Sequence, residues 1–334
     1  MKNKFQNNII YRLLILVKNR STSGFRSFYE AIGFMSLLIP PLNLIFSKLF
    51  SKVDVKKNST YKIFLFNMLN IGIGWGSLRY MKPEIKSHLG LAFNNYQIKK
   101  RNLKTYEKKE FKDNSKLLDD IKSNGYTKLG NFFNDKETLS VKDYFKNSSF
   151  YTSQVPEQGH KIDEGFLIKE SYTQSRYRSV EPEISLSCDL ISDFLKNDKL
   201  TDFLKIYFGF SPDLHNINTF ATMPFNFSHH VMKGHRDYDH FYGITVFISW
   251  TKTSKDNGAT MYLKGSNALN NIKEKEYTSI DSNPGDVYLL DTFGMHYGNP
   301  LVKDIRLATW LRYGTVPNYS YLINKPFFIN TETF

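Results

Sequence analysis

The sequence GHRDYDHFYGITVFISWTKTSKDNGATMYLKGSN, residues 234–267, contains two β-rich runs separated by a turn. Apolar and β-branched residues fill 243–252 and 259–263, which is typical of buried strands. Between these runs lies Asp256-Asn257-Gly258, and an Asn-Gly pair favours the backbone conformation of a tight hairpin turn. We therefore predict that these two runs form a β-hairpin.

Three further runs have the same β-rich character. They are 216–223, 286–291 and 305–313, and Pro284-Gly285 marks a turn just before the second of them. Helical signals precede the strands along the chain, and five strands in succession indicate a sheet that closes on itself or packs on another sheet. This order predicts an α+β fold with a sandwich or barrel core.

The helical signals lie between 115 and 209. A short helix over 115–123 ends at Asn124-Gly125, and a strand follows over 126–132. Asn134 or Asp135 can cap a helix that continues to about residue 146. Residues 189–208 have helical periodicity throughout, so we predict one helix there with Gly209 as its end.

Charge divides the chain into two unequal parts. Residues 1–110 contain 20 Lys or Arg and 5 Asp or Glu, a net charge of +15, whereas residues 111–334 contain 25 and 27, a net charge of −2. A nearly neutral C-terminal part argues against a nucleic-acid groove there. Cys188 is the one cysteine of the chain, which excludes an internal disulfide framework and cysteine-rich zinc sites, and favours a reducing, cytoplasmic location.

The N-terminal region, residues 1–110, alternates apolar runs with basic clusters. The two longer runs, 31–46 and 63–78, are shorter than the roughly 20 residues that a membrane-spanning helix needs, and Pro40-Pro41 interrupts the first. We expect either a small packed helical subdomain or a module that associates with anionic membrane surfaces; a cleaved targeting peptide is a third reading. Residues 111–334 are then the second domain.

One constellation of residues has the pattern of a metal site. His235 and Asp237 are two positions apart, so in a strand both side chains lie on one face, with Arg236 turned away. His296 follows the strand run 286–291. Two histidines and one carboxylate form the facial triad that suits non-haem Fe(II) and leaves coordination positions open. We predict that His235, Asp237 and His296 are the metal ligands and the catalytic centre.

Arg306, ten residues after His296, is the fourth member of the pattern. It lies in an apolar strand run, where a buried guanidinium needs an anionic partner, and it can bind a carboxylate through two hydrogen bonds. The far carboxylate of 2-oxoglutarate would be such a partner. An ion pair with Asp304 or Asp291 is the alternative, and Arg312, on the same strand face, is the second candidate for this role.

Other polar residues near the triad fit a metal site less well. Asp239 lies roughly 13 Å from His235 in an extended strand, and His240 faces the opposite side. His229 and His230 are adjacent, so their side chains cannot both point at one ion in a regular strand.

These residues resemble the pattern of the phytanoyl-CoA dioxygenase-like family of Fe(II)/2-oxoglutarate oxygenases. The resemblance covers about residues 115–316 and rests on the elements His235-x-Asp237, Asp256-Asn257-Gly258, Gly265-Ser266, Gly285-Asp286, His296 and Arg306. The opening SNGYTKLGNFFNDKE, residues 123–137, is also similar to the start of the family. Three positions depart from the pattern: Lys264 stands where proline is usual, Asn267 where histidine is usual, and Gly298 where many members have serine.

The resemblance implies a fold and an activity. The fold is a double-stranded β-helix (jelly-roll, cupin-like) core with flanking helices, to which the basic N-terminal helical region is added. The activity is hydroxylation of an unactivated C–H bond in a small-molecule or lipid-like substrate, with Fe(II) as cofactor, 2-oxoglutarate as cosubstrate bound by Arg306, and O₂. Asp237 favours hydroxylation over halogenation, because halogenating relatives have a small residue in its place. The alternative is a non-catalytic binding protein of the same fold, docked to a membrane by residues 1–110.

Overall fold

The computed structural model describes residues 98, 102–107, 114–152, 161–162, 177–224, 234–237, 242–268, 276–314 and 329–330. The chain divides into two compact units, and the unit made of residues 104–237, 243–314 and 326–334 holds all the helices and strands considered below. Nearly all of the predictions for the N-terminal region fall outside the described residues. Within the described ranges, no helix combines the length and the apolar character needed to cross a membrane.

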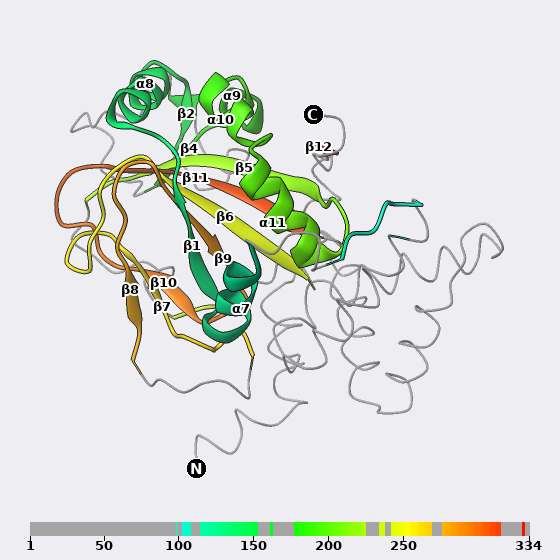
Figure 1. The fold of residues 1–334 in the computed structure, drawn as a ribbon. Helices are drawn as coiled ribbons and strands as arrows, with labels where there is room; N and C mark the ends of the chain where they lie inside the picture. The colour runs from blue at the N-terminus through cyan, green and yellow to red at the C-terminus, as the bar shows by residue number, and fades with distance from the viewer. Residues whose placement is uncertain are drawn as a thin grey trace, which may run out of the picture. The chain divides into compact units, whose positions relative to one another are not determined.

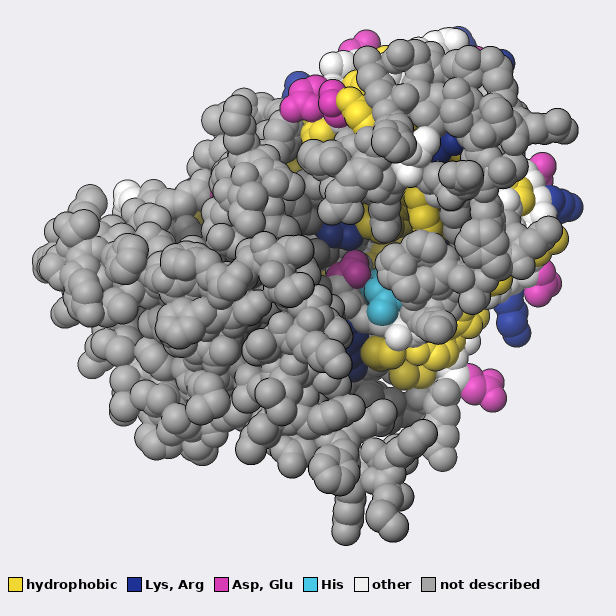
Figure 2. Space-filling model, turned by 180° about the vertical axis from the view of Figure 1, so that it is seen from behind, with side chains coloured by type: hydrophobic (Ala, Val, Ile, Leu, Met, Phe, Trp, Pro, Cys, Tyr) yellow, Lys and Arg dark blue, Asp and Glu magenta, His cyan; other side chains and the backbone are white. Residues whose placement is uncertain are grey.

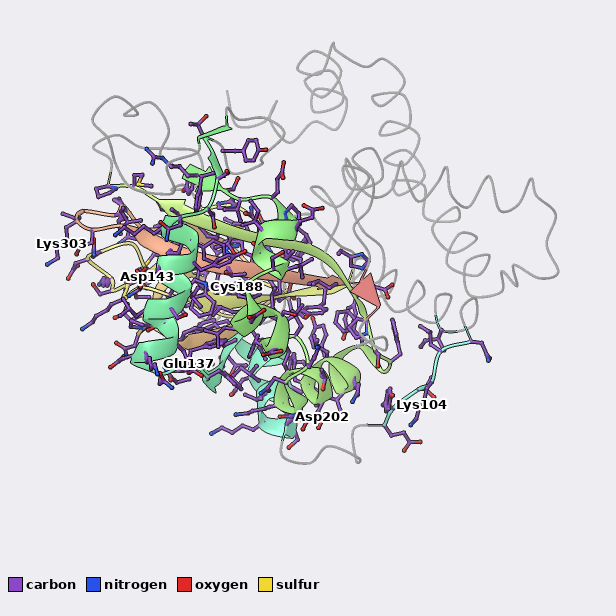
Figure 3. All side chains as sticks on the ribbon, turned by 90° about the horizontal axis from the view of Figure 1, so that it is seen from above. Lys104, Glu137, Asp143, Cys188, Asp202 and Lys303 are labelled. Atoms are coloured by element: carbon purple, nitrogen blue, oxygen red, sulfur yellow. The ribbon has the colours of Figure 1, made fainter. Side chains whose placement is uncertain are left out.

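The structure describes five helices in this unit, and all of them come before strand β5 (Asp213–Thr222) in the chain. They are α7 (Ser115–Asn124), α8 (Asp135–Lys146), α9 (Pro182–Leu186), α10 (Asp189–Phe194) and α11 (Asp198–Phe208). The predicted ends are confirmed: Gly125 and Gly209 adopt left-handed backbone conformations with φ of 86° and 79° after α7 and α11. Asn134 caps α8 in a reciprocal capping box with Glu137, whose side chain is labelled in Figure 3.

The predicted single helix over 189–208 is wrong in one respect, because the structure has two helices there. The chain leaves α10 after Phe194, and Asn197 then starts α11 by accepting a hydrogen bond from the backbone N–H of Leu200. An asparagine that caps a helix competes with continuation of the preceding one. Cys188, which precedes α10, is buried among the helices (Figure 3).

The strands of the described residues form two antiparallel sheets. The large sheet has the order β1-β9-β6-β11-β5-β4-β2-β3, with β12 also paired to β5, and the small sheet has the order β10-β7-β8. Their bounds are β1 Tyr126–Asn131, β2 Phe150–Tyr151, β3 Lys161–Ile162, β4 Tyr177–Ser179, β5 Asp213–Thr222, β6 Gly243–Ser249, β7 Thr260–Tyr262, β8 Thr278–Ile280, β9 Asp286–Leu290, β10 His296–Gly298, β11 Arg306–Gly314 and β12 Ile329–Asn330.

The predicted hairpin between 243–252 and 259–263 is also corrected by the structure. The turn forms, with the N–H of Asn257 donating to the carbonyl of Ser254 at 2.9 Å, but the strands it joins lie in different sheets. Both edges of β6 are already paired, one with β9 and the other with β11. With no free edge on β6, the chain continues into the small sheet, where β7 pairs with β10 and β8.

The two faces of the large sheet have different neighbours. On β5, the hydroxyl of Thr219 accepts a hydrogen bond from Ser185 of α9 at 2.8 Å, and helices α9–α11 lie on this side in Figure 1. The neighbouring residue Phe220 points to the other face, toward the small sheet, as alternation along a strand requires. The large sheet is therefore covered by helices on one side and by the small sheet on the other.

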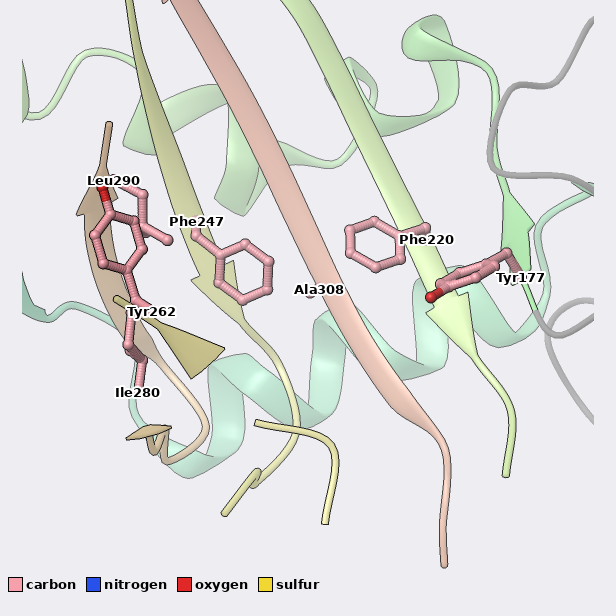
Figure 4. Close-up of a cluster of buried hydrophobic side chains, with 7 residues drawn as sticks. All are labelled: Tyr177, Phe220, Phe247, Tyr262, Ile280, Leu290 and Ala308. Atoms are coloured by element: carbon pink, nitrogen blue, oxygen red, sulfur yellow. The ribbon is translucent and has the colours of Figure 1, made fainter. Parts of the chain in front are cut away.

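An apolar cluster fills the space between the two sheets. Large-sheet residues meet small-sheet residues in it, as Figure 4 shows for Tyr177, Phe220, Phe247, Leu290 and Ala308 on one side and Tyr262 and Ile280 on the other. Tyr262 is fully buried in this cluster. Two antiparallel sheets packed face to face, with helices added on the outside, confirm the predicted α+β fold with a double-stranded β-helix, jelly-roll core.

Asp286, at the start of β9, joins β9 to its neighbour β1 within the large sheet by polar contacts. Its carboxylate, buried to 2% exposure, accepts hydrogen bonds from Lys128 Nζ at 2.8 Å, from Asn131 Nδ2 at 3.0 Å and from the N–H of Asn283 at 3.0 Å. Burial alone raises the pKa of this carboxyl, but these hydrogen bonds outweigh burial, so the pKa of Asp286 is lowered from its ordinary value. The Gly-Asp element of the sequence motif thus has a structural role here.

Asp286→Asn should lower the free energy of unfolding by about 1–3 kcal/mol at pH 7, because it replaces the buried carboxylate that accepts three hydrogen bonds, one of them from a cation, with a neutral amide. A carboxyl whose folded pKa is depressed contributes stability above its unfolded pKa of about 3.9, and loses it as the pH falls through the lower folded pKa. The difference between wild type and variant should therefore shrink below about pH 4. Urea unfolding of both proteins across this range measures it.

Asp202→Asn is the matched control, because it removes a partly exposed ion pair with Lys205 on α11 and should change stability by less than about 0.5 kcal/mol. A difference between wild type and Asp286→Asn that is the same at pH 7 and pH 3 would contradict the ionic role of Asp286.

Candidate metal centre

Backbone pairing brings the two parts of the predicted triad together. The N–H of His235 donates to the carbonyl of His296 and the N–H of His296 donates to the carbonyl of His235, both at 2.9 Å. Two residues further on, the N–H of Asp237 donates to the carbonyl of Thr292 at 2.8 Å. The segment 234–237 forms an isolated bridge at His235 and is not a regular strand, but the pairing still places His235 and Asp237 beside His296.

The donor atoms of the triad converge on one point. His235 Nε2 lies 3.7 Å from Asp237 Oδ1, and His296 Nε2 lies 3.8 Å from Asp237 Oδ2. One ligand atom from each residue can be chosen so that all three lie within 4.8 Å of one another. Two donors that share an ion with bonds of about 2.0–2.2 Å can be at most about 4.4 Å apart, and the two measured distances satisfy this limit.

His296 is prepared for metal binding by its surroundings. Its Nδ1 is 2.9 Å from the carbonyl of Gly294, so Nδ1 carries the proton and Nε2 keeps a lone pair directed toward the other donors. Burial lowers the pKa of His296, which favours the neutral imidazole that a metal requires. The donor set of two imidazoles and one carboxylate fits Fe(II).

Tyr262 lies beside the imidazole of His296 in the small sheet. The two rings are nearly parallel, with an interplanar angle of 13° and centroids 6.4 Å apart, and β7 and β10 place the two residues in register. The hydroxyl of Tyr262 donates to the carbonyl of Asp291 at 2.7 Å, and burial raises the pKa of Tyr262 well above its ordinary value, so it stays protonated. Sequence reasoning missed Tyr262, since only the register of the small sheet brings it to His296.

Gly294→Ala should weaken metal binding, because a Cβ at this position would lie 1.7 Å from the hydroxyl of Tyr262. The tyrosine or the loop must move, and the carbonyl of Gly294 that orients His296 moves with the loop. Loss of such an orienting contact costs roughly 10- to 100-fold in metal affinity. Titration of the purified variant with Mn(II), followed by calorimetry, measures the effect.

The double variant Gly294→Ala/Tyr262→Leu is the companion to this test, because it removes the hydroxyl and the ring carbon that would lie 1.7 Å and 2.3 Å from the added Cβ. It should recover part of the lost affinity; equal affinity of wild type and Gly294→Ala would show that this contact does not orient His296.

Arg236 points away from the triad, as predicted. Its guanidinium donates to the carbonyl of Ser266 at 2.6 Å and to the carbonyl of Phe293, and it lies over the ring of Phe293. The hydroxyl of Ser266 in turn accepts a hydrogen bond from the N–H of Met295 at 2.6 Å. Ser266 and Arg236 therefore hold the loop before His296, a role that the sequence did not reveal.

Arg306 lies at the start of β11, with 8% of its surface exposed. Its Nη2 donates to the hydroxyl of Thr260 at 3.0 Å, and its guanidinium lies 5.1 Å from the centre of the Phe247 ring. Among the ion pairs formed between described residues, none joins Arg306 to Asp291 or Asp304, which were the alternative partners.

The register of the small sheet relates Arg306 to His296. Thr260 is opposite Gly298, which is two residues, or roughly 7 Å, along β10 from His296. A Cβ added to Gly298 would lie 3.9 Å from Nη1 of Arg306, so the residue that departs from the family pattern borders this guanidinium. A five-carbon dicarboxylate can bridge such a separation between a metal ion and the guanidinium.

Thr222 adds an unsatisfied polar group beside Arg306. It is opposite Arg306 in the pairing of β5 with β11, and its buried hydroxyl has no hydrogen-bond partner in the part of the chain that the structure describes. A buried hydroxyl normally has a partner, and a bound carboxylate would supply one. Thr222 and Thr260 were missed from the sequence because isolated threonines in strands carry no motif.

The remaining candidates are placed differently. Arg312 lies on the Asp237 side, with Nη2 3.4 Å from Asp237 Oδ2. Asp239, His240, His229 and His230 lie outside the described residues. Figure 2 shows a histidine, an acidic side chain and basic side chains gathered on one face of the molecule, next to hydrophobic side chains.

No family model matches the sequence, and no curated protein matches it. Among solved structures, the chain is similar to the non-haem α-ketoglutarate-dependent epimerase SnoN from nogalamycin biosynthesis, with 11% identity over 61% of this chain and 83% of SnoN, at a TM-score of 0.43. It is also similar to EctD from S. alaskensis, solved with 2-oxoglutarate and 5-hydroxyectoine, with 16% identity over 60% of this chain and 75% of EctD, at a TM-score of 0.43.

A third similar structure is HygX from Streptomyces hygroscopicus with nickel, 2-oxoglutarate and hygromycin B, with 13% identity over 60% of this chain and 86% of HygX, at a TM-score of 0.39. At these identities and TM-scores, a functional assignment rests on the residues of this chain rather than on the similarity.

Proposed function

We propose that this protein is an Fe(II)- and 2-oxoglutarate-dependent oxygenase that hydroxylates an unactivated C–H bond of a small-molecule or lipid-like substrate. The observation that supports this most strongly is the convergence of His235, Asp237 and His296, with the buried guanidinium of Arg306 beside Gly298, which is two residues along β10 from His296. The phytanoyl-CoA dioxygenase-like family, which the sequence resembles, belongs to this class.

Each residue has a distinct role in the proposal. His235, Asp237 and His296 hold Fe(II), which supplies, with 2-oxoglutarate and O₂, the oxidation of the C–H bond and the release of succinate and CO₂. Arg306 binds the far carboxylate of 2-oxoglutarate through charge-assisted hydrogen bonds. The hydroxyl of Thr260 accepts a hydrogen bond from Arg306, and this contact orients the guanidinium toward the carboxylate.

Two further features fit the cosubstrate. The unpartnered hydroxyl of Thr222 can donate to the same carboxylate, and the ring of Phe247 beneath Arg306 keeps water from the guanidinium on that side. A carboxylate in such a partly dry site gains more from a guanidinium than it would in water.

Asp237 favours hydroxylation over halogenation. Its carboxylate faces both histidines, so no protein position in the triad is left vacant for a halide. The reaction product should therefore gain one oxygen atom.

The test is a comparison of the full chain with and without Fe(II). Calorimetry should show that 2-oxoglutarate binds the Mn(II)-loaded protein and not the metal-free protein. A substrate screen of the Fe(II)-loaded protein should then show succinate release together with a product one oxygen heavier. Metal-dependent binding without succinate release from any substrate would favour the non-catalytic binding protein, and a chlorinated product would exclude hydroxylation.

A further inference from the structure

Arg312 makes a contact that neither metal binding nor cosubstrate binding uses. It lies on β11, and its side chain is 11% exposed. Its guanidinium lies over the ring of Trp310, with a distance of 4.8 Å to the ring centre, and its Nη2 is 3.4 Å from Asp237 Oδ2. Because the guanidinium is held between this ring and a carboxylate, its orientation is fixed, and its contact with Asp237 is a defined feature of the site.

Arg306 and Arg312 lie on the same face of β11 but have different tasks. Six residues separate them, which is roughly 20 Å along an extended strand. Arg306 contacts Thr260 at one end of the site, whereas Arg312 contacts Asp237 at the other. The two guanidinium groups therefore approach the metal centre from opposite ends, and one bound carboxylate does not explain both.

The contact with Arg312 makes the two oxygens of Asp237 unequal. Oδ1 is 3.7 Å from His235 Nε2 and Oδ2 is 3.8 Å from His296 Nε2, so without a further contact either oxygen, or both, could bind the ion. Arg312 engages Oδ2. An oxygen that accepts a charge-assisted hydrogen bond from a guanidinium is a weaker metal donor than its neighbour.

We propose that Arg312 is a positioning residue that holds Asp237 Oδ2 and thereby makes Oδ1 the one oxygen through which Asp237 binds the metal. The inference rests on the proposed function, since it needs a metal at the triad. With one bond from each of three residues, a six-coordinate ion keeps three positions for other ligands. A second bond from Asp237 would occupy one of those positions.

The aromatic residues behind Arg312 explain why this position is an arginine. The ring of Trp310 packs against Phe220, with centroids 4.6 Å apart, and against Phe247 at 6.4 Å. This fixed ring supports a planar guanidinium by stacking, which a lysine ammonium cannot reproduce. Arg312 is thereby pre-oriented toward Asp237.

Two effects of Arg312 on metal affinity have opposite signs. Its positive charge lies close to the site and repels a cation, so its removal would strengthen metal binding if charge dominated. If it orients Asp237, its removal weakens metal binding instead, by roughly 10- to 100-fold, as is typical of residues that orient a metal ligand. The direction of the change therefore distinguishes a positioning role from a mere neighbouring charge.

The experiment is a Mn(II) titration of the full chain as wild type, Arg312→Gln and Arg312→Lys, with crystal structures of the Mn(II)-loaded wild type and Arg312→Gln. Both variants should bind Mn(II) roughly 10- to 100-fold more weakly. Asp237 should bind through one oxygen in wild type and through two in Arg312→Gln. Lys303→Gln, which removes an exposed positive charge just before β11, is the matched control, and its Mn(II) affinity should equal that of wild type.

The outcomes separate the two proposals. If wild type binds no Mn(II), the proposed function fails and the role of Arg312 fails with it. If wild type binds Mn(II) and Arg312→Gln binds it equally or more tightly, with Asp237 still bound through one oxygen, only the role of Arg312 is overturned. Should Arg312→Gln not fold, Arg312→Lys and Trp310→Leu replace it, and unchanged Mn(II) affinity in both would overturn the role in the same way.

Discussion

Replacing His235, Asp237 or His296 with alanine should abolish Fe(II)-dependent succinate production while the fold stays intact. Each residue supplies one of the three protein donors, and their donor atoms converge within 4.8 Å. An open site held by three residues depends strongly on each, because the part of the chain that the structure describes offers no further donor beside these three. Succinate release measured at saturating 2-oxoglutarate tests each variant.

Circular dichroism and thermal unfolding should show that the three variants remain folded, since the pairing of segment 234–237 with His296 uses backbone groups that alanine retains. Asp202→Ala, a change at a partly exposed position of α11, is the matched control and should keep wild-type turnover. Wild-type turnover in any one of the three site variants would count decisively against the assignment.

Arg306→Ala should raise the KM for 2-oxoglutarate on the order of 100-fold, because the lost charge-assisted hydrogen bonds are worth a few kcal/mol. Binding of Mn(II) should change little, since Arg306 contacts Thr260 and Phe247 rather than the triad. Arg306→Lys should give an intermediate KM, because it keeps the charge but loses the planar fork. Initial rates of succinate release over a range of 2-oxoglutarate concentrations measure the three values.

Thr260→Val is the companion variant, because it removes the hydroxyl that orients Arg306 while keeping the shape of the side chain. It should raise the same KM by a smaller factor. If instead Arg312→Ala raised the KM for 2-oxoglutarate strongly and Arg306→Ala did not, Arg312 rather than Arg306 would be the residue that binds the far carboxylate.

Local chemistry made part of the fold predictable. Asn134 caps its helix, and Gly125 and Gly209 end theirs, because each of these residues satisfies backbone groups within a few positions of itself. The break at Asn197 was missed because the apolar periodicity continues across it. Apolar periodicity indicates which face of a helix is buried, whereas only the capping residue indicates where the helix starts.

The pairing of strands that are distant in the sequence could not be predicted from the sequence. The run 243–252 has every signal of a hairpin strand, yet β6 pairs with β9 and β11, which lie far along the chain. The grouping of His235, Asp237 and His296 could be named in advance because spacing and residue type mark a metal triad. Thr260 and Tyr262 could not, because they reach the site only through the register of β7 with β10.

The reciprocal backbone bonds between His235 and His296 also bear on how this protein is made. The two histidines are far apart in sequence, and Arg306 and the rest of β11 are synthesised later still. A chain emerging from the ribosome exposes its N-terminal segments first, and contacts between distant segments form only after both have emerged. The nascent polypeptide therefore cannot place His235 and Asp237 beside His296 until residue 296 has left the ribosome, so these three side chains come together only after the strands from β1 to β9 have been synthesised.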